Sequence, residues 1–184
     1  MRELALHLLD IAENSIAAKA KNITIRVEED SLQDTLRMSV EDDGVGMTPE
    51  VAARVTDAFY TTRTTRKVGL GLPLLKLAAE SCNGFLEVKS EVGKGTQITI
   101  QFQRSHIDRM PLGDLVTTYL TLLTTSPEIH WWFGYSLDEQ VFEFDDQELK
   151  EYLDGIPLTE PGVLTYIQEL FHSGVNELQP SGLN

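Results

Sequence analysis

The chain has 184 residues, of which 41% are apolar, and it can therefore form one well-buried core with a small appendage, or two small domains. Its formal charge of -14 at pH 7 opposes partners that need a positive surface, so we expect no nucleic acid and no anionic membrane as ligands. The single cysteine, Cys82, excludes an internal disulfide and a cysteine-based metal cluster. The N-terminal residues contain acids throughout and no long apolar block, which indicates neither a signal peptide nor a membrane span. We expect a cytoplasmic protein.

The first part of the chain, residues 1–103, alternates between helix and strand patterns. Apolar residues recur every three to four positions near the N-terminus, as in a helix with one buried face, and Thr48 before Pro49 is a typical helix start. Strand segments show apolar and polar residues in alternation. The predicted helices cover residues 4–21, 49–57 and 72–81, and the predicted strands cover 22–30, 35–42, 85–90 and 95–103. These elements favour an antiparallel sheet with helices stacked on one face.

The remaining residues have a different character. We expect a helix over 112–123, an aromatic hairpin over 129–145, and helices over 146–154 and 160–173. This part forms either a small α+β appendage or an extension of the first sheet. We therefore divide the chain into residues 1–104 and 105–184, and we predict an α+β fold, a two-layer sandwich with a small C-terminal α+β extension.

Two polar residues interrupt the apolar side of the first helix. Asp10 and Asn14 lie four positions apart and therefore share one face. Their oxygens are ligands of the kind that a hydrated Mg²⁺ prefers. The alternative is that both side chains simply face solvent.

A carboxylate at a strand end precedes two closely spaced glycines in EDDGVGM. The strand ends at Asp42, and Gly44 and Gly46 allow the backbone to turn and to approach a ligand closely. A carboxylate in this position can accept a hydrogen bond from an exocyclic amine such as that of adenine. A plain turn is the alternative, since Asp-Gly pairs often open turns.

The stretch AFYTTRTTRKVGLGLPLL places hydroxyls and cations directly before a helix. Gly69 and Gly71 expose backbone amides at the predicted helix N-terminus, which favours a phosphate. Four threonines and three cations, Arg63, Arg66 and Lys67, precede them in a chain that is otherwise strongly acidic. A final motif, GKGT, forms the turn into the last strand of this part and ends on Thr96.

The order and the even spacing of these motifs are more specific than any one motif. Asn14, Asp42, Gly69 and Thr96 follow each other at intervals of twenty-seven or twenty-eight positions. The set resembles the GHKL ATP-binding superfamily, which is named for DNA gyrase B, heat-shock chaperone, histidine kinase and MutL. DIAENS is similar to its N box, DDGVG to its G1 box, AFYTTR to its F box, GLGL to its G2 box, and GKGT to its closing strand motif. The resemblance covers about residues 1–103.

The resemblance implies a mixed, largely antiparallel sheet with helices on one side and Mg-ATP beneath a lid loop. By position, Asn14 would ligate magnesium, Asp42 would bind the adenine amino group, and Thr96 would lie near the adenine. The ATP-binding residues that it implies are Asp42, Gly44, Gly46, Met47, Phe59, Thr61, Thr62, Arg63, Arg66, Lys67, Val68, Gly69, Leu70, Gly71, Leu72 and Thr96.

Two departures from the family pattern bear on activity. The position four before the magnesium asparagine is usually glutamate in the hydrolysing branches, whereas here it is Asp10, one methylene shorter. Asp10 is therefore the candidate general base. Because a general base tolerates little displacement, its shorter side chain puts the hydrolysis of ATP in doubt. The lid, residues 63–68, is short and is similar to the lids of sensor kinases.

The segment RSHIDRMPLGD resembles in part the phosphoacceptor box of histidine kinases, with His106 at the position of the phosphorylated histidine. The residue that follows is Ile107 rather than an acid, and the segment comes after the ATP-binding part instead of before it. The alternative is that His106 and Asp108 help to cap a structural helix.

Together these features predict a histidine kinase-like protein that binds Mg-ATP. The first functional hypothesis is phosphotransfer to a histidine or a serine of a protein in signalling. The others are a nucleotide-gated protein-binding module with little turnover and a small ATPase. A regulatory protein partner is expected, and a homodimer is left open.

Overall fold

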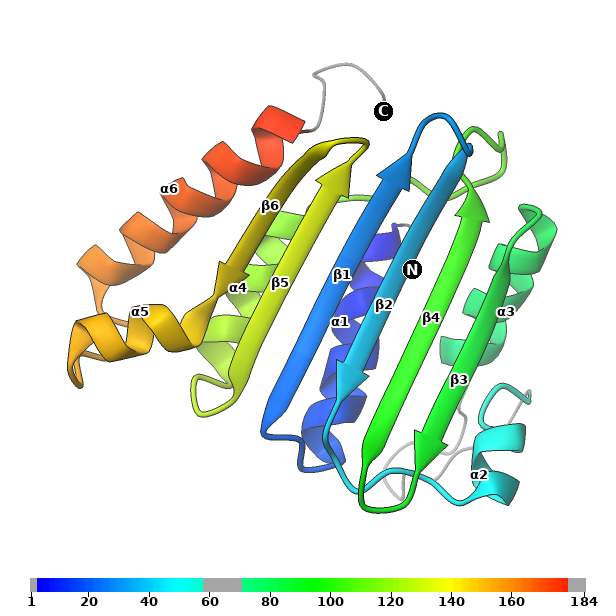
Figure 1. Ribbon diagram of the computed structural model, residues 1–184, viewed down its shortest axis with the longest axis horizontal. Coiled ribbons are helices and arrows are strands. Elements are labelled where there is room, and N and C mark those ends of the chain that lie inside the picture. Colours follow the sequence, from blue (N-terminus) through cyan, green and yellow to red (C-terminus); the bar gives the residue numbers. More distant parts are fainter. Residues whose placement is uncertain (1–2, 58–70, 179–184) are drawn as a thin grey trace.

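The computed structural model describes residues 3–57 and 71–178, which form a six-stranded sheet with helices (Figure 1). The helices are α1 (Leu4–Ala17), α2 (Pro49–Arg54), α3 (Gly71–Ser81), α4 (Leu115–Thr125), α5 (Asp146–Leu153) and α6 (Pro161–Leu178). The strands are β1 (Asn22–Asp30), β2 (Thr35–Asp42), β3 (Phe85–Glu91), β4 (Gly95–Gln103), β5 (His130–Leu137) and β6 (Gln140–Asp145).

The strands lie in the order β3-β4-β2-β1-β5-β6. All neighbouring pairs are antiparallel except β1 and β5, which run parallel. The fold is thus an α+β sandwich with a mixed, mostly antiparallel sheet, as expected. The aromatic hairpin β5–β6 extends the first sheet, which is one of the two arrangements that the sequence left open.

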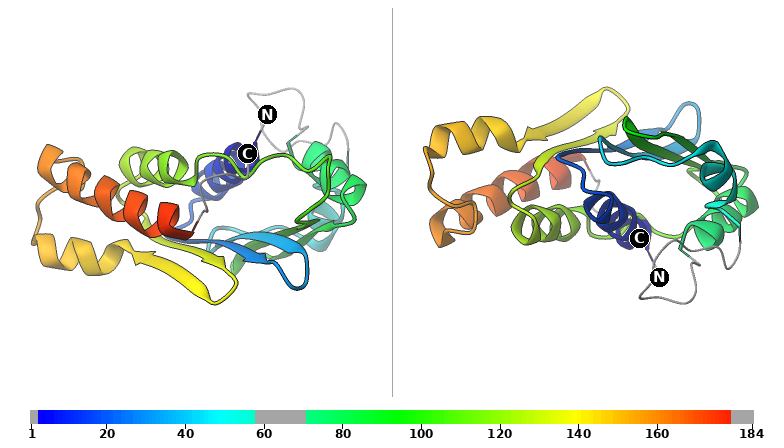
Figure 2. Two further views of the ribbon diagram at one scale, coloured as in Figure 1. Left: turned by 90° about the horizontal axis from the view of Figure 1, so that it is seen from above. Right: turned by 90° about the horizontal axis from the view of Figure 1, so that it is seen from below.

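The helices α1, α3 and α4 cover one face of the sheet (Figure 2). Alternation along the strands places Ile23, Ile25 and Val27 of β1 against this layer, where all three are buried. At the β5–β6 end of the sheet, Phe171 of α6 packs edge-on against Phe133 and Phe144, with ring centroids 6.0 and 4.7 Å apart. One continuous core therefore extends beneath both parts of the chain.

Several helix ends differ from the sequence-based prediction for local reasons. Helix α1 ends at Ala17 rather than near residue 21, because Lys19 adopts a left-handed conformation with φ of 62°. Helix α4 begins at Leu115 rather than Leu112, because Asp114 caps it by accepting a hydrogen bond from Thr117 N at 2.9 Å. Helix α2 ends at Arg54, three residues before the expected end.

Helix α6 is longer than expected and reaches Leu178, because Val175 and Leu178 continue its buried stripe. Within the described ranges, none of the helices combines the length and the hydropathy that a membrane span requires.

Candidate functional site

Asp42 is the last residue of β2, a central strand of the sheet, and it pairs with Ile23 of β1 on one side and with Thr96 of β4 on the other. Its side chain is 9% exposed. Its Oδ2 accepts a hydrogen bond of 2.6 Å from the hydroxyl of Ser15, and its Oδ1 accepts one of 2.9 Å from Gly44 N. The carboxylate is therefore held in one orientation by helix α1 on one side and by the turn after β2 on the other.

The backbone after Asp42 packs too closely on its neighbours to allow larger residues. A Cβ atom on Gly44 would lie 2.8 Å from the Ala18 carbonyl oxygen and 2.9 Å from Asp42 Oδ1. Gly46 has φ of 67°, and a Cβ there would collide with the backbone of Glu91. This explains the two glycines of the motif: they let the loop pack closely beside the carboxylate and on the backbone of Glu91.

Asp43 anchors the same loop to the start of β1. Its carboxylate accepts hydrogen bonds from Lys21 N at 2.7 Å, from Asn22 N at 2.9 Å and from the Asn22 side chain at 2.6 Å. Partial burial would raise the pKa of Asp43, but the hydrogen bonds from Asn22 and Lys21 outweigh it and hold the pKa below its ordinary value. Asp43 is therefore a structural acid, in contrast to its neighbour Asp42.

The Thr96 hydroxyl pairs with the Ser90 hydroxyl on the β4 side of Asp42. Its Oγ1 lies 2.8 Å from Ser90 Oγ, and Ser90 Oγ also accepts a hydrogen bond of 2.8 Å from Met47 N. Ser90 thus joins strands β3 and β4 to the loop that contains Gly46. The predicted residues Met47 and Thr96 lie at the same end of the strands as Asp42.

Asp10 and Asn14 are both half-buried on α1, in the two turns that lead to Ser15. A Cβ on Gly71, the first residue of α3, would lie 2.5 Å from Asp10 Oδ2. The structure therefore brings Asp10 against the N-terminus of α3, although sixty residues of sequence separate them. Leu72, the next residue of α3, packs against the core.

Most of the predicted phosphate-binding stretch lies outside the described residues. The predicted site residues concerned are Phe59, Thr61, Thr62, Arg63, Arg66, Lys67, Val68, Gly69 and Leu70.

His106 lies apart from the other predicted site residues. It follows β4, which runs from Gly95, next to the Thr96 that pairs with Asp42, to Gln103 at the opposite end of the strand. At the usual rise of a strand, this separates His106 from Thr96 by roughly 20 Å. Its ring Nδ1 accepts a hydrogen bond of 3.2 Å from Asp108 N, and its backbone carbonyl accepts one of 3.0 Å from Arg109 N. These contacts organise the turn before α4.

Three residues from the start of β5 and the junction of β6 with α5 have possible metal ligand atoms within 4.8 Å of one another: His130, Asp145 and Asp146. Their contacts favour a charge network instead. His130 Nε2 lies 2.7 Å from Asp145 Oδ1, and Lys150 Nζ lies 2.6 Å from the buried Asp146 Oδ2. The ammonium group already neutralises the most buried carboxylate of the cluster.

Ser15, Asp43 and Ser90 were not among the site residues predicted from sequence. For Ser15 there was a signal, because it continues the buried stripe Leu4, Leu8, Ile11 and Ala12 of the first helix. A serine at a buried helical position needs a hydrogen-bond partner. The identity of that partner, Asp42, depends on the tertiary structure.

A family model described as histidine kinase-, DNA gyrase B-, and HSP90-like ATPase matches residues 1–106. Among curated proteins, the chain is 32% identical over 118 residues to the non-motile and phage-resistance protein of Caulobacter vibrioides, a match that covers 59% of this chain and 14% of that protein. It is 33% identical over 109 residues to the sensor protein SrrB of Staphylococcus aureus, which covers 56% of this chain and 18% of that protein. The chain thus spans less than a fifth of the length of these two relatives.

Two solved structures are also similar. Full-length ShkA in complex with AMPPNP matches with a TM-score of 0.45 and 26% identity over 53% of this chain and 20% of that chain. The N-terminal domain of a DNA repair protein matches with a TM-score of 0.51 and 15% identity over 79% of this chain and 52% of that chain. The second likeness concerns the fold alone, and it includes part of the chain beyond the family match.

Proposed function

Because this chain belongs to the family of histidine kinase-, DNA gyrase B- and HSP90-like ATPases, we propose that it binds Mg-ATP beside Asp42 and transfers phosphate to a histidine or serine of a partner protein. Membership of this family implies ATP binding. The geometry around Asp42 is the observation that supports the location of the site and the identity of the residues.

The end of the sheet fits an adenine. Ser15 and Gly44 orient the Asp42 carboxylate, and the absence of a side chain at Gly44 leaves the approach beside it open. An oriented carboxylate accepts a hydrogen bond from an exocyclic amine, which distinguishes adenine from bases with a carbonyl at that position. The Thr96 and Ser90 hydroxyls supply further polar groups at the same end.

The face of α1 that carries Asp10 and Asn14 fits the magnesium ion. Both residues offer oxygen ligands and are half-buried, and Asp10 lies beside the start of α3. Mg²⁺ bound with ATP would neutralise charge on the phosphates. We assign Asn14 to the metal, and Asp10 to the ion or to the orientation of a water molecule.

A nucleotide-gated binding module with little turnover is the second candidate. Two observations favour it: Asp10 has the shorter side chain at the position of the base, and His106 lies roughly 20 Å from Thr96, at the far end of the sheet. Under the kinase proposal the phosphate acceptor therefore belongs to another protein or to a second copy of this chain.

The proposal is tested by calorimetry of ATP with Mg²⁺ on the whole chain. Asp42→Asn should weaken ATP binding by about tenfold or more, because the amide accepts with only one of its two polar atoms. Asp43→Asn is the matched control, since it changes the neighbouring acid, which among the described residues binds Lys21 and Asn22 at the start of β1. Equal affinity of the wild type and Asp42→Asn for ATP would contradict the assignment.

Incubation with γ-labelled ATP then separates the functional candidates. Label transferred to a partner protein supports the kinase, and acid-labile label that is lost in His106→Ala indicates autophosphorylation. Binding without transfer or phosphate release supports the gated module. Steady release of phosphate that Asp10→Asn abolishes identifies an ATPase.

A further inference from the structure

Negative charge is concentrated in the part of the chain that follows the family match. Residues 105–184 contain fourteen Asp and Glu residues and only two basic residues, Arg109 and Lys150. Residues 1–104 contain fifteen acidic and thirteen basic residues and are almost neutral. The β5–α6 segment therefore dominates the negative field of the protein, and its surface attracts cationic partners.

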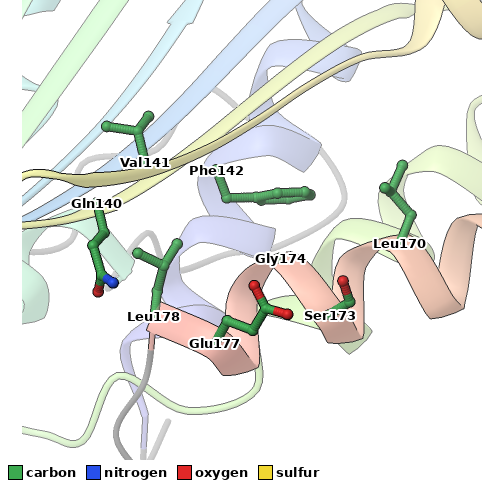
Figure 3. A pocket seen from close by; sticks show the side chains of 8 residues that line it. All are labelled: Gln140, Val141, Phe142, Leu170, Ser173, Gly174, Glu177 and Leu178. Carbon is green, nitrogen blue, oxygen red and sulfur yellow. The ribbon is translucent and has the colours of Figure 1, made fainter.

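A groove of about 460 Å³ lies between strand β6 and helix α6 (Figure 3). Its apolar lining residues are Val141, Phe142, Leu170 and Leu178, from both elements. Helix α6 approaches β6 closely at Gly174, where an added Cβ would collide with the Phe142 ring. The groove therefore results from the way helix α6 packs against strand β6.

The rim of this groove is acidic. Glu177 lines it directly, and Glu143 is exposed on β6 beside Val141. Neither carboxylate forms an ion pair with another described residue. Val141 is 61% exposed and shares one face of β6 with Glu143, whereas Glu177 faces the groove from α6.

The groove runs along an unpaired sheet edge. Strand β6 is the last strand of the sheet, and within residues 3–57 and 71–178 no strand pairs with its outer side. An edge strand leaves alternate N–H and C=O groups available for pairing with another chain. An extended peptide can add there as a further strand and place alternate side chains in the groove.

We propose that the groove between β6 and α6 binds an extended, lysine- or arginine-rich segment of a partner protein, which pairs with the free edge of β6. Charge selects this occupant. A second copy of the chain would bring Glu143 and Glu177 close to the same acids of its partner, and like charges at an interface disfavour association. Residues 179–184, QPSGLN, contain no cation that would match the rim. The proposal is independent of ATP.

The proposal is tested by NMR titration of the isotope-labelled whole chain, with and without Mg-ATP. The probe is a short capped peptide in which lysine and valine alternate, and the reference peptide has glutamate in place of lysine. Spermidine serves as a probe of charge alone. The lysine peptide should shift the amide signals of β6 and of α6 around Gly174, whereas the glutamate peptide should not.

Two charge reversals on the same helix form the matched comparison. Glu177→Lys should weaken binding of the lysine peptide by about three- to tenfold, as expected for loss and reversal of one rim contact. Glu169→Lys makes the same change of net charge at an exposed position of α6 outside the groove, and it should change the affinity by less than about twofold.

Three results would overturn the proposal: equal weakening by both variants, spermidine shifts that match those of the peptide, or lysine-peptide binding that leaves the β6 amides unshifted. Sedimentation showing a dimer that Glu177→Lys alters would instead identify a second copy as the occupant.

Discussion

The hydroxyl of Ser15 donates a hydrogen bond of 2.6 Å to the carboxylate of Asp42, and this contact joins helix α1 to the end of strand β2. Both side chains are buried. The bond orients the acid that we assign to adenine, and it fixes the helix that carries Asp10 and Asn14 relative to that acid. One serine thus connects the expected base-binding and metal-binding parts of the site.

Ser15→Ala should therefore lower both stability and ATP affinity. The change leaves Asp42 Oδ2 buried without its donor, which should lower the free energy of unfolding by about 1–3 kcal/mol. Urea denaturation measures this, and calorimetry measures the affinity for ATP. The control is Ser81→Ala, since the exposed Ser81 hydroxyl donates to Ala78 O within its own helix and otherwise lies 3.8 Å from Cys82 Sγ, and a loss of below about 0.5 kcal/mol is expected. Similar losses in both variants would show that the Ser15 bond is not special.

Alanine substitutions at two glycines with similar backbone angles distinguish the cost of conformational strain from the cost of a steric collision. Gly46 has φ of 67° and Gly93 has φ of 78°, so alanine at either position costs about 1 kcal/mol in conformational energy. A Cβ at Gly46 would also collide with Glu91, whereas one at Gly93 meets nothing within 4 Å. We expect Gly46→Ala to lower the free energy of unfolding by about 1–3 kcal/mol more than Gly93→Ala does. Equal thermal denaturation curves for the two variants would refute the packing described here.

The sheet of residues 22–42 and 95–103 could be predicted from sequence because alternation is a local property of each strand. Strands β1, β2 and β4 have the predicted bounds. The parallel pairing of β1 with β5 was not predictable, because no local pattern states which strand lies beside Asn22. Helix ends were predicted wrongly where a single backbone angle ends the helix, as at Lys19.

Part of the arrangement around Asp42 was also predictable from sequence. Motif order indicated Asp42 and Thr96, which the structure places at one end of the sheet. The partners that orient them, Ser15 and Ser90, come from other elements and required the fold.

His7 should give the protein a pH-dependent stability. It is buried on α1, and burial lowers its pKa below the ordinary value of 6.5, although Asp10 acts in the opposite direction. As the pH falls through 6.5, the unfolded chain takes up a proton before the folded chain does. The free energy of unfolding should therefore decrease on acidification below this pH.

The measurement is urea denaturation above and below pH 6.5. His7→Gln should remove part of the pH dependence, whatever its effect on stability at neutral pH. His172→Gln, at an exposed histidine of α6, should leave the pH dependence as in the wild type. An unchanged slope in His7→Gln would show that other groups cause it.

Tyr119 carries a hydroxyl that the fold does not use. The residue is fully buried on α4, its ring stacks on Phe133 with centroids 4.3 Å apart, and its oxygen has no hydrogen-bond partner among the described residues. Burial strongly raises the pKa of Tyr119, so the phenol stays neutral across the physiological range. Because an unsatisfied buried hydroxyl costs free energy, Tyr119→Phe should raise the free energy of unfolding by about 1 kcal/mol while retaining the stacked ring.

Replacing Tyr135 with phenylalanine should change the free energy of unfolding in the opposite direction. Its hydroxyl donates a hydrogen bond of 2.9 Å to Glu29 Oε1, and the ring is equally buried. Tyr135→Phe should therefore lower the free energy of unfolding by about 0.5–1.5 kcal/mol. Chemical denaturation of the two variants side by side measures the difference, since both variants lose one oxygen from a buried tyrosine. A loss of stability in Tyr119→Phe as large as that in Tyr135→Phe would mean that the Tyr119 hydroxyl has a partner in solution.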